Sequence, residues 1–146
     1  MEEKMIIRIL EKNDGAILQN ILKWSRPSAT VSLRRCEQLL AQPDNCLIAA
    51  MIDNIPVGLI VAYVIQRFRG DVMFLYEIDV HPEHRRKAIA RKLIEALKET
   101  CRTRKLKEIF VITEQSNVAA MRLYQKTGGH RPHADEAMFL YDLSDH

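Results

Sequence analysis

A cluster of cations and small residues lies in the segment EHRRKAIARKLI, residues 83–94. Arg85, Arg86 and Lys87 are consecutive, and alanines at positions 88 and 90 leave the backbone accessible. An apolar stripe with helical spacing starts at Ile89. The first turn of a helix has free N–H groups and a partial positive charge, and both suit a phosphate. We therefore predict a phosphate site at this helix N-terminus, with a solvated basic helix start as the alternative.

A second chemical feature is a carboxylate within an apolar strand. Glu77 interrupts VMFLYEIDV, residues 72–80, and Asp79 follows it. A carboxylate at such a position can accept a proton or hold a cation. The two side chains share a face if the strand is regular, whereas a β-bulge would change this. The alternative for Glu77 is an outward-facing carboxylate or a structural ion pair.

A third feature is a pair of residues on one helix face. Tyr124 lies seven residues after Asn117, which is two helical turns. The tyrosine hydroxyl is a candidate proton donor, and the asparagine is suited to cap the helix. A half-buried core tyrosine and a cap without further function are the alternatives.

The histidines and cysteines do not indicate a metal site or a nucleophile. Two histidine pairs sit in turns, without a third ligand at metal-binding spacing, so we predict surface histidines and no metal (His81, His84, His130, His133). The three cysteines have no paired spacing and lie in no nucleophile or zinc motif, which predicts free thiols in a reducing cytoplasm (Cys36, Cys46, Cys101).

Apolar periodicity and turn residues predict the elements that position these residues. Strands are expected at residues 5–10, 46–52, 56–68, 72–80, 108–113 and 137–143, and helices at 16–24, 32–42, about 85–104 and 117–126. The strands between residues 46 and 80 form an antiparallel meander, and the strand–helix–strand of residues 72–113 requires a right-handed crossover with parallel strands. We therefore predict a single α/β (α+β) domain over residues 1–146, with a central mixed, mostly antiparallel sheet flanked by helices.

Charge and hydropathy restrict the classes of partner that we expect the protein to bind. The net charge of +3 is mild, and the basic block has no interleaved aromatics, so we predict no nucleic-acid partner. No apolar run approaches the roughly 20 residues of a membrane span. The N-terminal MEEKMIIRIL is not typical of a signal peptide, and we expect a cytoplasmic protein without a membrane partner.

Two segments resemble a known family. EIDVHPEHRRKAIARKLI resembles motif A of the GNAT superfamily of acetyl-CoA-dependent N-acetyltransferases, with Arg85-x-x-Ala88-x-Ala90 in place of Arg/Gln-x-x-Gly-x-Gly/Ala. NVAAMRLYQKTGG, residues 117–129, is similar to the family's Asn-x-x-Ala-x-x-x-Tyr-x-Lys-x-Gly segment. The segments, their separation and the element order cover nearly the whole chain. The resemblance implies the GNAT fold, in which strands four and five are parallel and splay apart.

A narrower resemblance concerns the acceptor. GLIVAYVIQRF, YEIDV with EHRRKAIARKLI, and DEAMFLYDL are similar to the small GNAT-type aminoglycoside 3-N-acetyltransferases. This implies a gentamicin-like amine as substrate. Another small amine, a polyamine or a protein amine is an alternative. A non-catalytic acyl-CoA-binding module is the alternative from another class, and the presence of both Glu77 and Tyr124 argues against it.

The resemblance also implies roles for residues. Acetyl-CoA would bind with its pyrophosphate on the backbone N–H groups of residues 86–91, so that the cofactor set contains Arg85, Arg86, Lys87, Ala88, Ile89, Ala90 and Arg91. The backbone of Ile78 and Val80 would pair with the pantetheine arm as with an added strand, and Asn117 would touch the cofactor. In a direct transfer within a ternary complex, Glu77 would deprotonate the amine and Tyr124 would protonate the thiolate, while strand N–H groups polarise the carbonyl.

Three further expectations concern the substrate and the departures from the motif. Asp79, Asp135 and Glu136 are candidates for an acidic mouth that binds a polycationic substrate, with ordinary charged surface as the alternative. Ala88 replaces the first motif glycine, and we expect it to adopt the helical φ/ψ of the turn while its methyl group crowds the pyrophosphate. A homodimer through the last strand or the exposed sheet edge is an open alternative.

Overall fold

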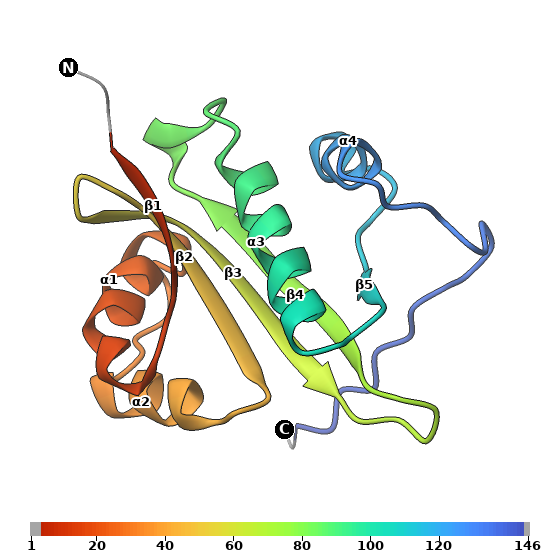
Figure 1. Ribbon diagram of the computed structural model, residues 1–146, viewed down its shortest axis with the longest axis horizontal. Coiled ribbons are helices and arrows are strands. Elements are labelled where there is room, and N and C mark those ends of the chain that lie inside the picture. Colours follow the sequence, from red (N-terminus) through yellow and green to blue (C-terminus); the bar gives the residue numbers. More distant parts are fainter. Residues whose placement is uncertain (1–3, 145–146) are drawn as a thin grey trace.

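The computed structural model describes residues 4–144 and contains a five-stranded sheet with helices on both faces (Figure 1). The sheet order is β1-β2-β3-β4-β5, and every neighbouring pair is antiparallel except the parallel pair β4–β5. This confirms the predicted α/β class and mixed sheet. The strands are β1 (Met5–Ile9), β2 (Asn45–Ile52), β3 (Ile55–Ile65), β4 (Val72–Val80) and β5 (Ile109–Val111).

Four helices and two short 3₁₀ turns complete the described part of the fold. They are η1 (Lys12–Asp14), α1 (Gly15–Ser25), α2 (Leu33–Ala41), η2 (Pro82–His84), α3 (Ile89–Thr103) and α4 (Val118–Lys126). Helices α1 and α2 cover one face of the sheet and α3 covers the other, while α4 lies beyond β5 (Figure 1). The parallel β4–β5 pair follows from the α3 crossover, as predicted from the sequence.

The sheet separates two apolar cores, and β2 contributes to both. Its side chains alternate, so Ile48 and Ala50 face the core under α3, whereas Leu47 and Ala49 face the core under α1 and α2. A strand that is buried on both faces reads as a continuous apolar run, which explains why CLIAAMI was recognisable in the sequence.

Helix α3 packs closely on β3 at Gly58. A Cβ at this position would lie 2.9 Å from Cγ2 of Ile89 and 3.2 Å from Cδ1 of Leu93. Glycine therefore permits the first turn of α3 to rest directly on the sheet. The side chains of the helix that are buried against the sheet recur with helical spacing and fix its rotation (Ile89, Leu93, Ile94, Leu97, Cys101).

A β-bulge in β4 changes which face its later residues occupy. Val61 of β3 pairs with Glu77 and Ala62 pairs with Leu75, so Tyr76 is the extra residue. Leu75 belongs to the core under α3, whereas Val61 packs against the core under α1 and α2. The bulge thus moves Glu77 to the face opposite Leu75, and Asp79 shares the face of Glu77 because both follow the bulge.

The predicted last strand is wrong. Residues 137–143 form no strand, and five large apolar side chains of this segment are exposed (Met138, Phe139, Leu140, Tyr141, Leu143). β-propensity alone does not make a strand, because the backbone also needs a hydrogen-bonding neighbour. In the described part of this chain, hydrogen bonds from residues 130–144 stay within that segment.

Candidate active site

The edge of β4 is open where the family resemblance predicts the cofactor. β4 and β5 pair only at three positions, the last of which joins Leu75 to Val111. β4 continues to Val80, so residues 76–80 have no β5 partner on that edge. The two parallel strands therefore splay apart, as expected. An open strand edge presents backbone donors and acceptors that a ligand can pair with.

The predicted basic helix start is a loop in the structure, and α3 begins four residues later than Arg85, at Ile89. Arg85 is extended, while Arg86 and Ala88 have positive φ values of 67° and 59°. Ala88 is the N-cap in a left-handed conformation, so the expectation that it would be helical is wrong. Left-handed backbone costs a residue with a Cβ about 1 kcal/mol or more, which explains the usual motif glycine.

This loop nevertheless has the form of an anion site. Residues with left-handed backbone alternate with ordinary ones directly before a helix, an arrangement in which successive N–H groups line a concavity. The side chains of Arg85, Arg86, Lys87 and Ala88 are exposed, whereas Ile89 is buried and anchors the loop to the sheet. Lys87 approaches His84, with Nζ 3.4 Å from Nδ1.

Glu77 and Asp79 are bridged by an arginine that the sequence did not single out. Arg26 directly follows α1, and its Nη2 donates to Oε2 of Glu77 while its Nη1 lies 3.3 Å from Oδ2 of Asp79. The side chains of Glu77 and Asp79 are 29% and 34% exposed, so a ligand can reach both. The ion pair foreseen for Glu77 therefore exists, and it joins β4 to the end of α1.

The pKa of Glu77 reflects three influences. Burial raises it above the usual range of a glutamate, the positive charge of Arg26 lowers it, and the negative charge of Asp79 raises it. A carboxyl group with a raised pKa is a stronger proton acceptor once it is ionised. The position of Glu77 on the sheet thus suits a general base.

Tyr124 lies on the other side of the sheet. It lines a cavity of about 320 Å³ together with Leu75 and Val111, and it packs against the core under α3. Burial raises the pKa of its hydroxyl, so the group stays protonated at neutral pH. Glu77 and Tyr124 therefore approach the splayed β4–β5 edge from opposite faces of the sheet.

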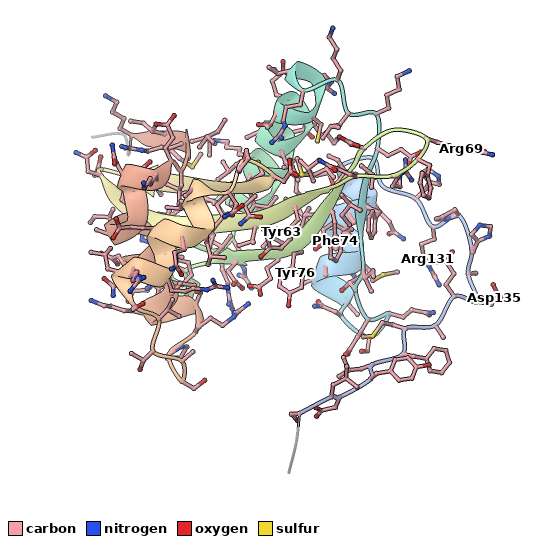
Figure 2. All side chains as sticks on the ribbon, turned by 90° about the horizontal axis from the view of Figure 1, so that it is seen from below. Tyr63, Arg69, Phe74, Tyr76, Arg131 and Asp135 are labelled. Carbon is pink, nitrogen blue, oxygen red and sulfur yellow. The ribbon has the colours of Figure 1, made fainter. Side chains whose placement is uncertain are left out.

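The remaining predicted residues are separate from this pair. Asn117 caps α4, because its Oδ1 accepts a hydrogen bond from N of Ala120 at 3.1 Å. Asp135 lies on the outer loop that follows α4, apart from Tyr76 (Figure 2), and Glu136 is its exposed neighbour. Within one chain, the structure does not bring these two acids to Glu77.

An aromatic stripe beside Glu77 was also missed in the sequence. The rings of Tyr63 and Tyr76 lie 5.7 Å apart, those of Phe74 and Tyr76 lie 5.8 Å apart, and Phe74 stacks on Phe110 at 4.6 Å. Figure 2 shows Tyr63, Phe74 and Tyr76 side by side on the sheet. These residues come from three strands, and only Phe74 and Tyr76 alternate along the same strand, so the sequence does not signal the whole stripe.

Residues 4–144 have three further features. They contain no group of three or more histidine, cysteine or acidic side chains that could hold a metal. All three cysteines are free and buried, and burial raises the pKa of Cys46 to about 11. No described helix is long and apolar enough to cross a membrane.

Comparisons with known proteins identify the family. The model of the acetyltransferase (GNAT) family matches residues 15–129. No curated protein matches the sequence. An aminoglycoside acetyltransferase, meta-AAC0020, from an uncultured soil metagenomic sample, in complex with trehalose, superposes with a TM-score of 0.88 at 20% identity, over 96% of this chain and 97% of that chain.

Two further solved structures have the same fold. Aminoglycoside N-acetyltransferase AAC(6')-Iy in complex with CoA gives a TM-score of 0.80 at 19% identity, over 99% of this chain and 98% of that chain. The ribosomal-protein-alanine N-acetyltransferase from Brucella melitensis biovar Abortus 2308 gives 0.73 at 18% identity, over 94% and 100%. With the family model spanning both motifs, from α1 through α4, the chain belongs to the GNAT family of acetyltransferases.

Proposed function

We propose that the protein transfers an acetyl group from acetyl-CoA to a primary amine of a small aminoglycoside-like cation, by direct transfer in a ternary complex. The observation that carries this proposal is the pair of accessible carboxylates, Glu77 and Asp79, beside the open edge of β4. A carboxylate pair attracts a protonated amine, and one member can then accept its proton. The family supplies the acetyl chemistry.

The residues present fit acetyl-CoA. The backbone of Ile78 and Val80 lies on the stretch of β4 without a β5 partner, which suits the pantetheine arm. The concave loop of residues 85–88 and the start of α3 suit the pyrophosphate, and the side chains of Arg85, Arg86 and Arg91 add positive charge. When bound, acetyl-CoA supplies an activated thioester. Asn117 would contact it in addition to capping α4.

The chain's own residues would move two protons. Glu77 accepts a proton from the amine through a carboxylate oxygen, directly or through a water. Tyr124 Oη donates a proton to the departing thiolate from the other side of the sheet edge, and its raised pKa keeps that proton available. Backbone N–H groups of β4 beyond Leu75 would polarise the acetyl carbonyl. The buried thiols do not serve a covalent intermediate.

The aromatic stripe supports a ring-shaped acceptor. Tyr76 is 54% exposed and is the immediate neighbour of Glu77, with Tyr63 in contact on the adjacent strand. Aromatic faces bind the apolar faces of flat ligands, while carboxylates bind their amines. Some solved structures of similar fold are described as acetyltransferases in complex with sisomicin or trehalose. If the acceptor is an antibiotic, its acetylation would give resistance.

The test is release of the CoA thiol from acetyl-CoA with gentamicin, kanamycin, spermidine and a lysine peptide as acceptors. We expect fast release with an aminoglycoside, and loss of release in Glu77→Gln. The matched control is Glu99→Gln, which alters an exposed carboxylate of α3. Acetyl-CoA binding without release for any of these acceptors would contradict the aminoglycoside proposal and move the acceptor to another amine.

A protein amine is the second candidate. It is favoured by the likeness of the fold to a ribosomal-protein-alanine N-acetyltransferase. A peptide with an N-terminal alanine, added to the acceptor panel, separates the two. Preferential turnover of this peptide would replace the small cation as substrate. A non-catalytic acyl-CoA-binding module would bind acetyl-CoA and turn over nothing.

We further propose that the protein forms a homodimer in which the segment of residues 137–143 pairs with β5 of a second copy. The five large apolar side chains of this segment are 70–90% exposed, and Figure 2 shows the segment projecting away from the sheet. Strand β5 is the edge of the sheet and exposes Phe110, so it can accept another strand. Exposed apolar surfaces of this kind usually mark an interface. Pairing of the two C-terminal segments in this way would also bring Asp135 and Glu136 of the second copy to the sheet edge.

Light scattering after size exclusion tests the dimer. We expect the full chain to be dimeric, and both a chain ending at residue 136 and Leu140→Asp to be monomeric. Ile55→Asp is the control, because Ile55 is also exposed and apolar but lies at the start of β3. A monomeric full chain would overturn the proposal.

The basic loop of residues 85–88 and the free thiols bear on the partners of the protein and on its location in the cell. We propose that the basic loop serves the pyrophosphate and that the protein binds no nucleic acid, which retention on DNA at low salt would contradict. We also propose a cytoplasmic location without a membrane partner, since free thiols fit a reducing compartment.

A further inference from the structure

Arg26 makes a three-way contact between α1 and β4. Its Nη2 donates to Oε2 of Glu77, and its Nη1 lies 3.3 Å from Oδ2 of Asp79 and 2.8 Å from the carbonyl oxygen of Ser25. The two terminal nitrogens of the guanidinium therefore donate hydrogen bonds to acceptors on two elements, α1 and β4. Such a planar fork fixes the direction of its partners better than a lysine ammonium can.

The end of α1 is itself fixed on the sheet. The indole of Trp24 contacts the ring of His81 edge to face at 5.1 Å, directly after β4. The N–H of Arg26 closes the helix on the carbonyl oxygen of Leu22 at 2.8 Å. A cation at a helix C-terminus is favoured by the helix dipole and by the carbonyls of the last turn. The arginine is therefore held from its backbone as well as from its side chain.

The contacts leave part of Glu77 available. The arginine's hydrogen bond to Glu77 ends on Oε2, and no described residue donates a hydrogen bond to Oε1. The side chain of Glu77 remains partly exposed. An acceptor amine can therefore approach Oε1 while the guanidinium holds Oε2.

We propose that Arg26 is a positioning residue of the acceptor site, which holds the carboxylates of Glu77 and Asp79 side by side and leaves Oε1 of Glu77 for the acceptor amine. This inference rests on the proposed base role of Glu77. It assigns Arg26 no contact with the acetyl group and no proton transfer. The arginine acts through the two carboxylates that it orients.

The charges around Glu77 support this role. Burial raises the pKa of Glu77, Arg26 from the end of α1 lowers it, and Asp79 of β4 raises it. Tyr63 of β3 also faces Glu77, and Arg35 of α2 acts on that tyrosine. Without Arg26, the pKa of Glu77 rises further, because its lowering influence is lost. The arginine thus favours the ionised form of the base.

The experiment compares Arg26→Gln, Arg26→Lys and the control Arg102→Ala, which removes an exposed arginine paired with Glu99 on α3. Carboxyl ¹³C NMR of glutamate-labelled protein gives the titration of Glu77, whose signal is assigned by its loss in Glu77→Gln. The same variants are assayed for kcat and KM against pH with the best acceptor. Circular dichroism checks that each variant is folded.

In Arg26→Gln we expect Glu77 to titrate at higher pH than in the unaltered protein, and the acid limb of kcat/KM to move with it. In Arg26→Lys the titration should stay close to that of the unaltered protein, because the charge remains. Its kcat should fall on the order of ten-fold to a hundred-fold, because an ammonium cannot hold both carboxylates in place. Arg102→Ala should match the unaltered protein.

An unchanged Glu77 titration in Arg26→Gln, or an unchanged kcat in Arg26→Lys, would overturn the positioning role. The NMR titration does not depend on turnover. If Glu77 shifts as expected while the unaltered protein acetylates no amine, the contact of Arg26 with the carboxylate is supported and the proposed function fails.

Discussion

Leu75 and Glu77 are two residues apart in β4, yet they lie on opposite faces of the sheet, because Tyr76 forms a β-bulge between them. In a regular strand Glu77 would point into the apolar core under α3, where an unpaired carboxylate is costly. The bulge instead gives it Arg26 and solvent access. The position of this one extra residue thus places Glu77 on the face where we propose that the acceptor binds.

Replacing Glu77 by glutamine should lower kcat/KM by about 10²-fold to 10⁴-fold, the usual contribution of a general base. In the unaltered protein, the rate should fall as the pH drops through the pKa of Glu77, since a protonated carboxyl cannot accept a proton. This acid limb lies above the usual glutamate range because burial raises the pKa. The variant should lack the limb, and a retained limb would assign it to another group. Initial rates across pH check both points.

Replacing Tyr124 by phenylalanine should lower kcat by roughly ten-fold and leave the KM for the acceptor unchanged. The effect is smaller than for the base, because a thiol has a pKa of about 8.5 and leaves readily even without a proton donor. The variant should unfold at the same denaturant concentration as the unaltered protein. An unaffected kcat would mean that Tyr124 is a core residue of the α3 face only.

Replacing Ala88 by glycine should stabilise the loop before α3. The left-handed backbone at φ 59° costs alanine about 1–2 kcal/mol, while glycine loses roughly 0.4–1 kcal/mol through greater freedom in the unfolded chain. We expect a net gain of up to about 1.6 kcal/mol in the free energy of unfolding.

The matched control for this change is Ala90→Gly, at the second residue of α3. It should destabilise by about 0.5–1 kcal/mol, because glycine is unfavourable within a helix. Denaturant unfolding measures both variants, and calorimetry gives their affinity for acetyl-CoA. Ala88→Gly should bind at least as tightly as the unaltered protein. Equal destabilisation by both changes would contradict the left-handed conformation.

Replacing Gly58 by alanine should push α3 away from β3. The new Cβ would lie 2.9 Å from Cγ2 of Ile89, and overpacking of this kind costs typically 1–3 kcal/mol. Affinity for acetyl-CoA should fall as well, because Ile89 anchors the loop of residues 85–88. In an Ile89→Leu background, which lacks Cγ2, the cost should be smaller. A double-mutant cycle by denaturant unfolding measures this difference, and strict additivity would count against the contact.

Local sequence patterns were enough to predict most of the helices and strands. The buried run of β2, the helical stripe of α3 and the capping asparagine of α4 each depend on neighbours within a few residues of the chain, and the structure has all three. The order of these elements required the parallel β4–β5 pair. The GNAT family was therefore readable from two motifs and their separation.

Only the tertiary structure decided how the proposed acceptor side around Glu77 and Asp79 is built. Arg26 meets Glu77 and Asp79 across 51 and 53 residues of sequence, and the aromatic stripe joins three strands. The left-handed residues before α3 and the bulge at Tyr76 became visible only in the folded backbone. Residues 137–143 have strand-like composition but no partner strand within residues 4–144. Composition and spacing specify what an element can be, whereas the contacts between distant elements determine which face, partner and conformation it adopts.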